Sequence, residues 1–376
     1  MKLVVSSSEL LKGIMTVSGA LPKKTTEAIL ENYLFALKGD TLRITASDKE
    51  ISLRTEVPVQ NTLEEGRIAV PVKHLEFLKT LADQPITIGT TGENTLECSW
   101  GTGASTLSYN NPDDYPVIKT PGEGAITVSI PAESLAKAIG STAYAASNED
   151  NRPIMNSIFF DITPDGTTLV ASDLQKLVCY SATDLKAGQN ASFILNRGHA
   201  VSLRKILGKE ENVEISFDDK VIEFRFGGTT AICNLVLGKY PAYKTIIPQN
   251  NSNILTISRT LLLNTVQRIS MFSPKGSNHI KLEFSGNSLE VGSLAVSAQD
   301  TGFEIAGHDT VACSYEGDDL TIGFKSTHLI DMLSNLSCDT VVIKFADKRR
   351  AALVLPSEEE AAEERVFGIV MPVMVR

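Results

Sequence analysis

The chain has 376 residues, 42% of them hydrophobic and 21% charged, which predicts two or three folded domains and argues against a disordered protein. Its formal charge of −10 argues against a nucleic-acid binder unless Lys and Arg gather on one surface, because affinity for phosphates comes from clustered cations. No secretory apolar segment opens the chain and no run of about 18 apolar residues occurs, so we expect a cytoplasmic protein that does not bind membranes.

A pattern of segments occurs three times at a spacing of about 125 residues, which is the size of a domain. Each copy opens with a helix-like segment, at residues 8–14, 133–139 and 260–266. A serine lies close to the start of each segment, where its hydroxyl can cap the first free N–H groups of a helix. These serines are Ser8, Ser129 and Ser258.

Strand-like segments follow the first helix of each copy, and a further strand then leads into a second helix with apolar residues spaced by three and four. A pair of strands closes the copy. Two helices and about eight strands per copy predict an α+β domain whose helices pack on antiparallel sheets. Turn-forming residues at 112–124 and 240–251 divide the chain into three predicted domains, 1–124, 125–249 and 250–376.

A cation lies at the start of each predicted second helix, at Lys73, Arg197 and Lys325. A positive charge is disfavoured at a helix N-terminus by about 0.3 to 1 kcal/mol, so helix stability does not explain these positions. A phosphate bound at the same N–H groups would reverse that penalty. The alternative is that all three are ordinary solvated side chains.

The three copies, the segments 151–156 and 238–243, and the ending Val370-Met371-Pro372-Val373-Met374 together resemble the bacterial DNA polymerase III beta subunits, the DNA sliding clamps. The similarity runs through the whole chain. The resemblance implies that two subunits, joined head to tail, close a six-domain ring around duplex DNA and tether the polymerase without reading the base sequence.

The resemblance places Lys24, Lys73, Arg197 and Lys325 among the residues that contact DNA. Arg152 is a further candidate, because it lies just beyond the first helix of the second copy. Related proteins can carry polar or aromatic DNA contacts where this chain has Glu149, Ile154 and Gly198, so part of the DNA surface differs here.

The resemblance also implies a pocket for partner peptides, and methionine suits such a surface because its flexible side chain adapts to different ligands. The chain departs from the family at Leu174-Gln175-Lys176, where Gly-His-Arg is common, and at Thr245, where Arg is common. Alternatively, residues 367–375 are simply a terminal strand that completes a sheet. The matching positions are Met155, Ser172, Leu174, Gln175, Lys176, Leu177, Pro241, Thr245, Ile246, Val370, Met371, Pro372, Val373 and Met374.

The implied subunit interface brings an edge strand with Ser105, Thr106 and Leu107 against Met271 and Phe272 of a second subunit. Alternatively, Met271 and Phe272 are core residues. The implied partners are double-stranded DNA, a second copy of the chain, the replicative polymerase catalytic subunit, the clamp loader and other proteins with a clamp-binding motif.

Nothing in the sequence predicts an enzyme. Phosphate-binding loops, zinc-protease motifs and nucleophile elbows are missing from the sequence, and its five cysteines include no C-x-x-C pair, so we expect no metal and no cofactor. The competing hypotheses are a cytoplasmic interaction scaffold that does not bind DNA and a hydrolase with dispersed catalytic residues.

Overall fold

The computed structural model describes residues 1–208, 212–285, 292–357 and 364–375. By their internal contacts the residues form two compact units, one of residues 1–133 with 202–235 and one of residues 134–201 with 236–376. The second sequence copy is therefore divided between the units. The predicted domain boundaries near 124 and 249 stay a prediction.

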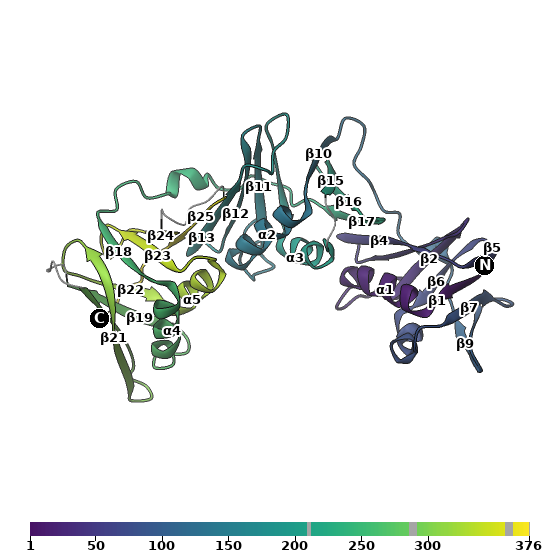
Figure 1. The fold of residues 1–376 in the computed structure, drawn as a ribbon, viewed down its shortest axis with the longest axis horizontal. Helices are drawn as coiled ribbons and strands as arrows, with labels where there is room; N and C mark the ends of the chain where they lie inside the picture. The colour runs from purple at the N-terminus through teal and green to yellow at the C-terminus, as the bar shows by residue number, and fades with distance from the viewer. Residues whose placement is uncertain (209–211, 286–291, 358–363, 376) are drawn as a thin grey trace. The chain divides into compact units, whose positions relative to one another are not determined.

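The first copy contains helix α1 (Ser7–Val17), the 3-10 helix η3 (Val72–Thr80) and nine strands (Figure 1). Shorter 3-10 turns are η1 (Ser18–Ala20), η2 (Ala28–Glu31) and η4 (Pro112–Asp114). The strands are β1 (Lys2–Ser6), β2 (Asn32–Lys38), β3 (Thr41–Ser47), β4 (Ile51–Pro58), β5 (Asn61–Glu64), β6 (Gly66–Pro71), β7 (Pro85–Thr90), β8 (Thr95–Trp100) and β9 (Gly103–Ser108).

The second copy contains helices α2 (Ala132–Thr142) and α3 (Arg197–Ile206), with short turns η5 (Ala143–Ala145) and η6 (Tyr243–Ile246). Its strands are β10 (Ile126–Pro131), β11 (Ser157–Thr163), β12 (Gly166–Ser172), β13 (Lys176–Ala182), β14 (Ala191–Asn196), β15 (Asn212–Phe217), β16 (Val221–Phe226) and β17 (Thr229–Asn234).

The third copy contains helices α4 (Arg259–Ser270) and α5 (Ser326–Asn335). Its strands are β18 (Asn253–Ser258), β19 (His279–Phe284), β20 (Gly292–Asp300), β21 (Ile305–Glu316), β22 (Leu320–Lys325), β23 (Thr340–Phe345), β24 (Ala352–Pro356) and β25 (Glu364–Val370). The repeated order of helices and strands confirms the predicted α+β class with three similar copies.

The sheets join neighbouring copies through antiparallel strands. In the first unit, β17 pairs with β4 to give an eight-stranded sheet of order β10-β15-β16-β17-β4-β3-β2-β6, beside a five-stranded sheet β5-β1-β7-β8-β9. In the second unit, β25 pairs with β13 within the twelve-stranded order β14-β11-β12-β13-β25-β24-β23-β18-β21-β20-β19-β22. The last strand of copies 2 and 3 thus completes a sheet of the preceding copy.

Several strands have an open edge in the described residues, and two of these edges lie where an equivalent strand is paired in another copy. The last strand of copy 1, β9, pairs only with β8. The third-copy counterpart of β4 and β13 is β21, whose residues 305–313 pair only with β20. Each of these two edges is equivalent to a strand that is paired elsewhere in the chain.

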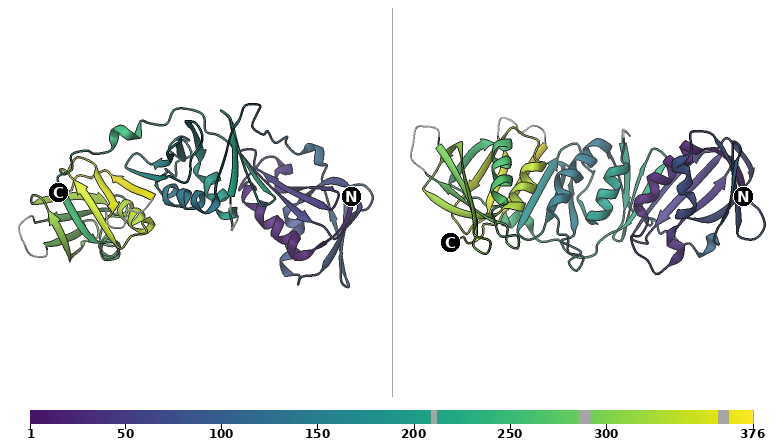
Figure 2. Two further views of the ribbon diagram at one scale, coloured as in Figure 1. Left: turned by 45° about the horizontal axis from the view of Figure 1, so that its top comes forward. Right: turned by 90° about the horizontal axis from the view of Figure 1, so that it is seen from below.

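Helix α1 packs against β3 and β4 (Figure 1), with Leu10, Ile14 and Val17 buried. A Cβ on Gly13 would come within 2.5 Å of Val57 Cγ2, so the glycine lets the helix lie close to the sheet. In the second unit α4 and α5 lie side by side (Figure 2) and bury their apolar faces. None of the helices in the described ranges is long and apolar enough to span a membrane.

Only one of the three predicted capping serines caps a helix as expected. The Ser258 hydroxyl accepts a hydrogen bond from the Leu261 N–H at the start of α4. In α1 the cap is Ser6, which accepts from the Glu9 N–H, while Ser8 lies inside the helix. Ser129 lies within β10, so its prediction was wrong because the strand runs up to the helix.

The second helix of copy 1 is a 3-10 helix, where the sequence predicted a helix like those of the other copies. Its apolar residues Leu75 and Leu78 are buried, and they are followed by Leu81, so the spacing is three throughout. A repeat of three matches the three residues per turn of a 3-10 helix. Pro71 precedes it and offers no side-chain cap.

Candidate functional site

The structure places a cation at the start of the second helix in every copy. Lys73 is the second residue of η3, Arg197 the first residue of α3, and Lys325 the N-cap residue of α5. Lys73 is exposed, and Arg197 and Lys325 are half-buried. None of the three forms an ion pair with a residue in the described ranges, which leaves their charge available to a phosphate.

The remaining DNA candidates differ in how far the protein itself neutralises them. Lys24 is exposed in the segment after η1. Arg152 forms an ion pair with Glu149, with 3.3 Å between Nε and Oε2. The Arg197 guanidinium donates to Ala143 O at 2.9 Å and to Asn148 Oδ1 at 2.5 Å, so its side chain is oriented by its own copy. Among the predicted DNA contacts, Arg152 is the one whose charge is offset by an ion pair within the described residues.

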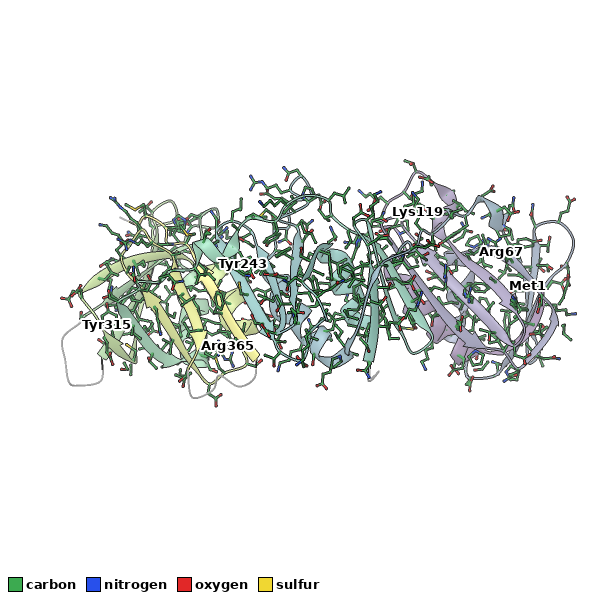
Figure 3. The ribbon with its side chains drawn as sticks, turned by 90° about the horizontal axis from the view of Figure 1, so that it is seen from above. Met1, Arg67, Lys119, Tyr243, Tyr315 and Arg365 are labelled. Atoms are coloured by element: carbon green, nitrogen blue, oxygen red, sulfur yellow. The ribbon has the colours of Figure 1, made fainter. Side chains whose placement is uncertain are left out.

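An apolar cavity of about 290 Å³ lies in the second unit, between the β12–β13 turn, residues 240–246 and the end of β25. Figure 3 labels Tyr243, which lies at the cavity, and Arg365, which lies near the start of β25, away from the cavity. The cavity is lined by Met155, Ser172, Leu174, Gln175, Lys176, Leu177, Tyr240, Pro241, Tyr243, Ile246, Ala351, Ile369 and Met371.

Nine of the predicted pocket residues line this cavity, and five do not. Thr245 is exposed and its hydroxyl donates to Ala242 O, while Val370 is fully buried at the end of β25. Pro372, Val373 and Met374 continue along β22 instead. Met374 lines a second cavity of about 500 Å³ together with residues of β19, β20 and β21.

Four lining residues were not predicted: Tyr240, Tyr243, Ala351 and Ile369. Tyr240 stacks on Phe159 with ring centroids 4.9 Å apart, and the Tyr243 hydroxyl donates to Asp161 Oδ2 at 2.8 Å. Burial and the Asp161 contact raise the pKa of Tyr243, so its hydroxyl remains a donor. Both tyrosines lie in the 238–243 segment that carried the resemblance, whereas Ile369 reaches the site only through β13–β25 pairing.

The C-terminal tail is held by backbone contacts. Met371 N–H donates to Gln175 O at 2.8 Å, and Val373 N–H donates to Gly323 O at 2.9 Å. A Cβ on Gly323 would lie 2.6 Å from Val373 O and would also clash with Val375. A glycine inside a strand often marks such a close approach of another backbone. Gly323 therefore lets the tail lie on β22 with Met371 at the cavity.

The turn that borders the cavity is formed by hydrogen bonds from two side chains. Asp173 Oδ1 accepts from the N–H groups of Gln175 and Lys176, and Ser172 Oγ accepts from the Leu174 N–H. Leu174 has a φ of +77°, a left-handed conformation that costs residues other than Gly and Asn about 1 to 2 kcal/mol. Its side chain is 58% exposed at the cavity.

Charged groups from α5 support this turn. Lys176 is only 6% exposed, and its Nζ lies 2.5 Å from Asp331 Oδ2 and 3.9 Å from Asp173 Oδ2. His328 Nε2 lies 3.5 Å from Asp173 Oδ2. Burial is the largest cause that lowers the pKa of His328, and the nearby Lys176 and Lys325 act in the same direction. His328 is therefore neutral near pH 7, while Lys176 is the cation of the group.

The predicted interface residues lie on or beside the two open edges. Ser105, Thr106 and Leu107 belong to β9. Met271 follows α4 and is 72% exposed, so the alternative that it is a core residue is wrong. Phe272 is half-buried and lies over Gly307 of β21, where a Cβ would clash with its ring. That these residues meet in a dimer stays a prediction.

The described residues contain no group of three or more His, Cys, Asp or Glu arranged to hold a metal ion. All five cysteines are buried and free of disulfides, and burial raises the pKa of Cys98 and Cys179 to about 12. The thiols of Cys98 and Cys179 are therefore protonated near neutral pH and unreactive.

Comparisons with known proteins cover nearly the whole chain. Family models for the DNA polymerase III beta subunit match residues 1–119 as its N-terminal domain, 129–242 as its central domain and 244–373 as its C-terminal domain. The beta sliding clamp of Haemophilus influenzae is 24% identical over 96% of this chain and 98% of its own, and that of Vibrio cholerae is 26% identical over 99% and 100%. A crystal structure of the Pseudomonas aeruginosa sliding clamp bound to griselimycin is 25% identical over all of both chains, with a TM-score of 0.92.

Proposed function

The chain belongs to the DNA polymerase III beta subunit family, and we propose that it is a non-catalytic sliding clamp that encircles duplex DNA and tethers the replicative polymerase to it. The tether acts through effective concentration: a polymerase that lets go of the primer end remains close to it. The expected location is the cytoplasm, where the DNA of a bacterium lies.

The observation that carries this proposal is the pairing rule of the strands. The last strand of copy 2 pairs with β4 of copy 1, and the last strand of copy 3 pairs with β13 of copy 2. By the same rule the open edge of β9 fits the open edge of β21 in a second subunit. Two such junctions close a homodimer of six domains head to tail, and closure removes both edges.

The DNA surface of this ring consists of Lys24, Lys73, Arg152, Arg197 and Lys325. Lys73, Arg197 and Lys325 recur at the same helix position, which supports a common role in contacting phosphates. Contacts of this kind bind every base sequence equally and weaken as salt rises.

The 290 Å³ cavity is the proposed site for peptide segments of the polymerase catalytic subunit, the clamp loader and other partners. Its walls are mainly apolar, with Met155 and Met371 able to repack around different side chains. The sliding clamp of Pseudomonas aeruginosa binds griselimycin, which supports a ligand site on the protein.

Loading onto plasmid DNA tests the encircling function. The protein, loaded by a bacterial clamp loader and ATP, is expected to stay on nicked circular DNA through gel filtration and to leave after the DNA is linearised. Retention on both forms, or on neither, contradicts a clamp. Sedimentation and negative-stain imaging are expected to show a dimer with a central hole.

Charge reversal tests the DNA surface. Changing Lys73, Arg197 and Lys325 to Glu is expected to weaken DNA binding and to flatten the plot of log affinity against log salt by about 0.9 per lost phosphate contact. The control changes three exposed lysines away from helix starts, Lys38, Lys119 and Lys220, to Glu, which alters the net charge equally. Equal salt slopes in the two variants contradict the assignment.

A further inference from the structure

After the last strand of each copy, the chain crosses to the strand that precedes the second helix of the same copy. One backbone hydrogen bond marks this contact in every copy. The N–H of Asn110 donates to Ala69 O of β6, that of Val236 to Ile194 O of β14, and that of Val373 to Gly323 O of β22. Three segments therefore reach equivalent places on three sheets.

In copies 1 and 2 the segment continues and buries a tyrosine on the sheet. Tyr115 is 5% exposed and lies beside Ser47 of β3. Tyr240 is 6% exposed and stacks on Phe159 of β11, with ring centroids 4.9 Å apart. A proline follows each tyrosine. A Tyr-Pro segment thus covers one face of the sheet in each of these copies.

Strand pairing aligns copy 3 with copy 2. The acceptor in β14 is paired with Phe159 and the acceptor in β22 with Lys281, so Lys281 holds the place of Phe159. Lys281 lines the cavity of about 500 Å³, which therefore lies where Tyr240 stacks in copy 2. Of the described tail, Met374 and Val375 line one side of this cavity. Within the described residues, copy 3 thus leaves open a face that copies 1 and 2 cover.

The open face of copy 3 offers nitrogen donors and no carboxylate of its lining. His279 and Lys281 of β19 and His308 of β21 line the cavity, and none of the described lining residues is acidic. Glu283 lies beside the cavity, with 3.2 Å between its Oε1 and Lys281 Nζ. In a chain with 45 acidic and 35 basic residues, a cavity lined in this way suits an acidic ligand.

In the covered copies, the segment carries a charge opposite to that of the sheet. Asp113 Oδ1 of the first segment lies 3.5 Å from Arg67 Nη1 of β6. In copy 2 the signs are reversed, with Lys244 Nζ of the segment 2.9 Å from Asp161 Oδ2 of β11. By the same rule, a segment that covers the basic face of copy 3 is acidic.

We propose that the face of β19, β20 and β21 in copy 3 binds a partner protein through an extended segment with acidic residues next to a tyrosine. The ring lies over Lys281, and the carboxylates meet His279 and His308. This surface is separate from the 290 Å³ cavity. In the proposed dimer the β21 edge pairs through its backbone groups, which leaves the side chains of this face free.

The test uses a linker probe, a fluorescein-labelled peptide with the sequence of residues 110–119, which contains Asp113, Asp114 and Tyr115. The full-length protein is expected to bind it saturably in fluorescence anisotropy. Gln299→Glu adds one carboxylate at an exposed position of the cavity lining and is expected to weaken binding at least fivefold. The double variant Lys281→Gln, His308→Gln is expected to weaken it at least as much.

The matched control is Gln60→Glu, which adds the same charge at an exposed glutamine of copy 1 and is expected to leave binding unchanged. A linker probe with Asn in place of Asp113 and Asp114 is expected to lose less than twofold in Gln299→Glu, because the repelled charges are gone. A linker probe with Ser in place of Tyr115 is expected to bind the unaltered protein at least fivefold more weakly.

Absence of saturable binding overturns the proposal, as do equal affinities of Gln299→Glu and Gln60→Glu. Equal affinities of the tyrosine and serine probes overturn the role of the ring and with it the likeness to the covered copies. Binding that is lost in Leu174→Glu but kept in Gln299→Glu places the linker probe in the 290 Å³ cavity and overturns the second surface.

Discussion

Two turns with one backbone design have opposite chemistry. At the β3–β4 turn, Asp48 Oδ1 accepts from the N–H groups of Glu50 and Ile51, and Lys49 has the φ of +77° found at Leu174. In each case a residue at the end of the neighbouring last strand donates its N–H to the turn. Asn234, the last residue of β17, donates to Glu50 O, and Met371, the residue after β25, donates to Gln175 O, both at 2.8 Å.

The side chains decide what each turn does. At the β3–β4 turn Lys49 pairs with Glu27, and the Asn234 amide donates to Lys49 O, so polar groups close the junction. At the β12–β13 turn Leu174 and Met371 leave apolar side chains exposed around a cavity. One repeated scaffold thus gives a structural junction in one place and a candidate binding site in the other.

The largest expected effect comes from removing the C-terminal tail after β25. This tail lies beside the β12–β13 turn, whereas at the β3–β4 turn the strand β17 continues into the segment that leads to copy 3. Deleting residues 373–376 removes the Val373 hydrogen bond to Gly323 and leaves Met371 held at the cavity only by its own hydrogen bond to Gln175 O. We expect peptide affinity to fall at least about 100-fold, or about 2.7 kcal/mol, in fluorescence anisotropy. Dimer formation, measured by sedimentation, is expected to persist.

A second variant separates tail position from tail length. Gly323→Val places a side chain where the tail lies, and we expect roughly tenfold weaker peptide binding. In the shortened chain the same substitution should add nothing. An equal loss in both backgrounds would show that the valine acts on β22 itself.

The next effect concerns stability. Ile51 in the β3–β4 turn and Lys176 in the β12–β13 turn occupy equivalent positions. The variant Lys176→Ile places the isoleucine of the first turn in the second. The change leaves Asp331 and Asp173 without their cation, and since Asp331 is 42% exposed we expect a loss of about 2 kcal/mol in the free energy of unfolding in urea. Ile51→Val is the control and should cost about 1 kcal/mol. A more stable Lys176→Ile variant would mean that desolvation of the lysine outweighs its ion pairs.

Met371→Asn places an asparagine beside the β12–β13 turn, as Asn234 lies beside the β3–β4 turn. The asparagine amide is expected to form a hydrogen bond with the turn, as the Asn234 amide does, and to replace an apolar side chain in the cavity wall. We expect peptide affinity to fall roughly tenfold, or about 1.4 kcal/mol. Met371→Leu should bind nearly as well as the unaltered protein. Similar affinities for the Asn and Leu variants would break the comparison.

The smallest effect is a pH dependence that only the second turn possesses. The pKa of His328 lies below its ordinary value of 6.5, so the unfolded chain takes up a proton at a pH where the folded chain does not. Its stabilising contribution is complete above pH 6.5 and declines as pH falls. We expect the free energy of unfolding to drop by about 1 kcal/mol between pH 6.5 and 5.5. The drop over the same interval is expected to be smaller in the His328→Phe variant. Equal slopes in both proteins would contradict this.

Much of the fold could be predicted from the sequence, because repetition, helical spacing and alternating strands are local patterns. The start of each second helix at Lys73, Arg197 and Lys325 was predicted correctly for this reason. Ala351 and Ile369 were not predicted at the cavity, because their place depends on which strands pair across the chain. The path of Val373 and Met374 away from the cavity depends on the missing side chain of Gly323.

By itself the sequence determined the α+β class, the three copies and the residue types gathered at each candidate site, since all of these follow from short-range order along the chain. Only the tertiary structure decided that copy 2 shares its strands with both neighbours, that Lys176 is buried beneath the turn, and that Leu174 is exposed above it. Burial and strand partnership are set by residues more than 150 positions away, such as Asp331 for Lys176, and no local pattern encodes those distances.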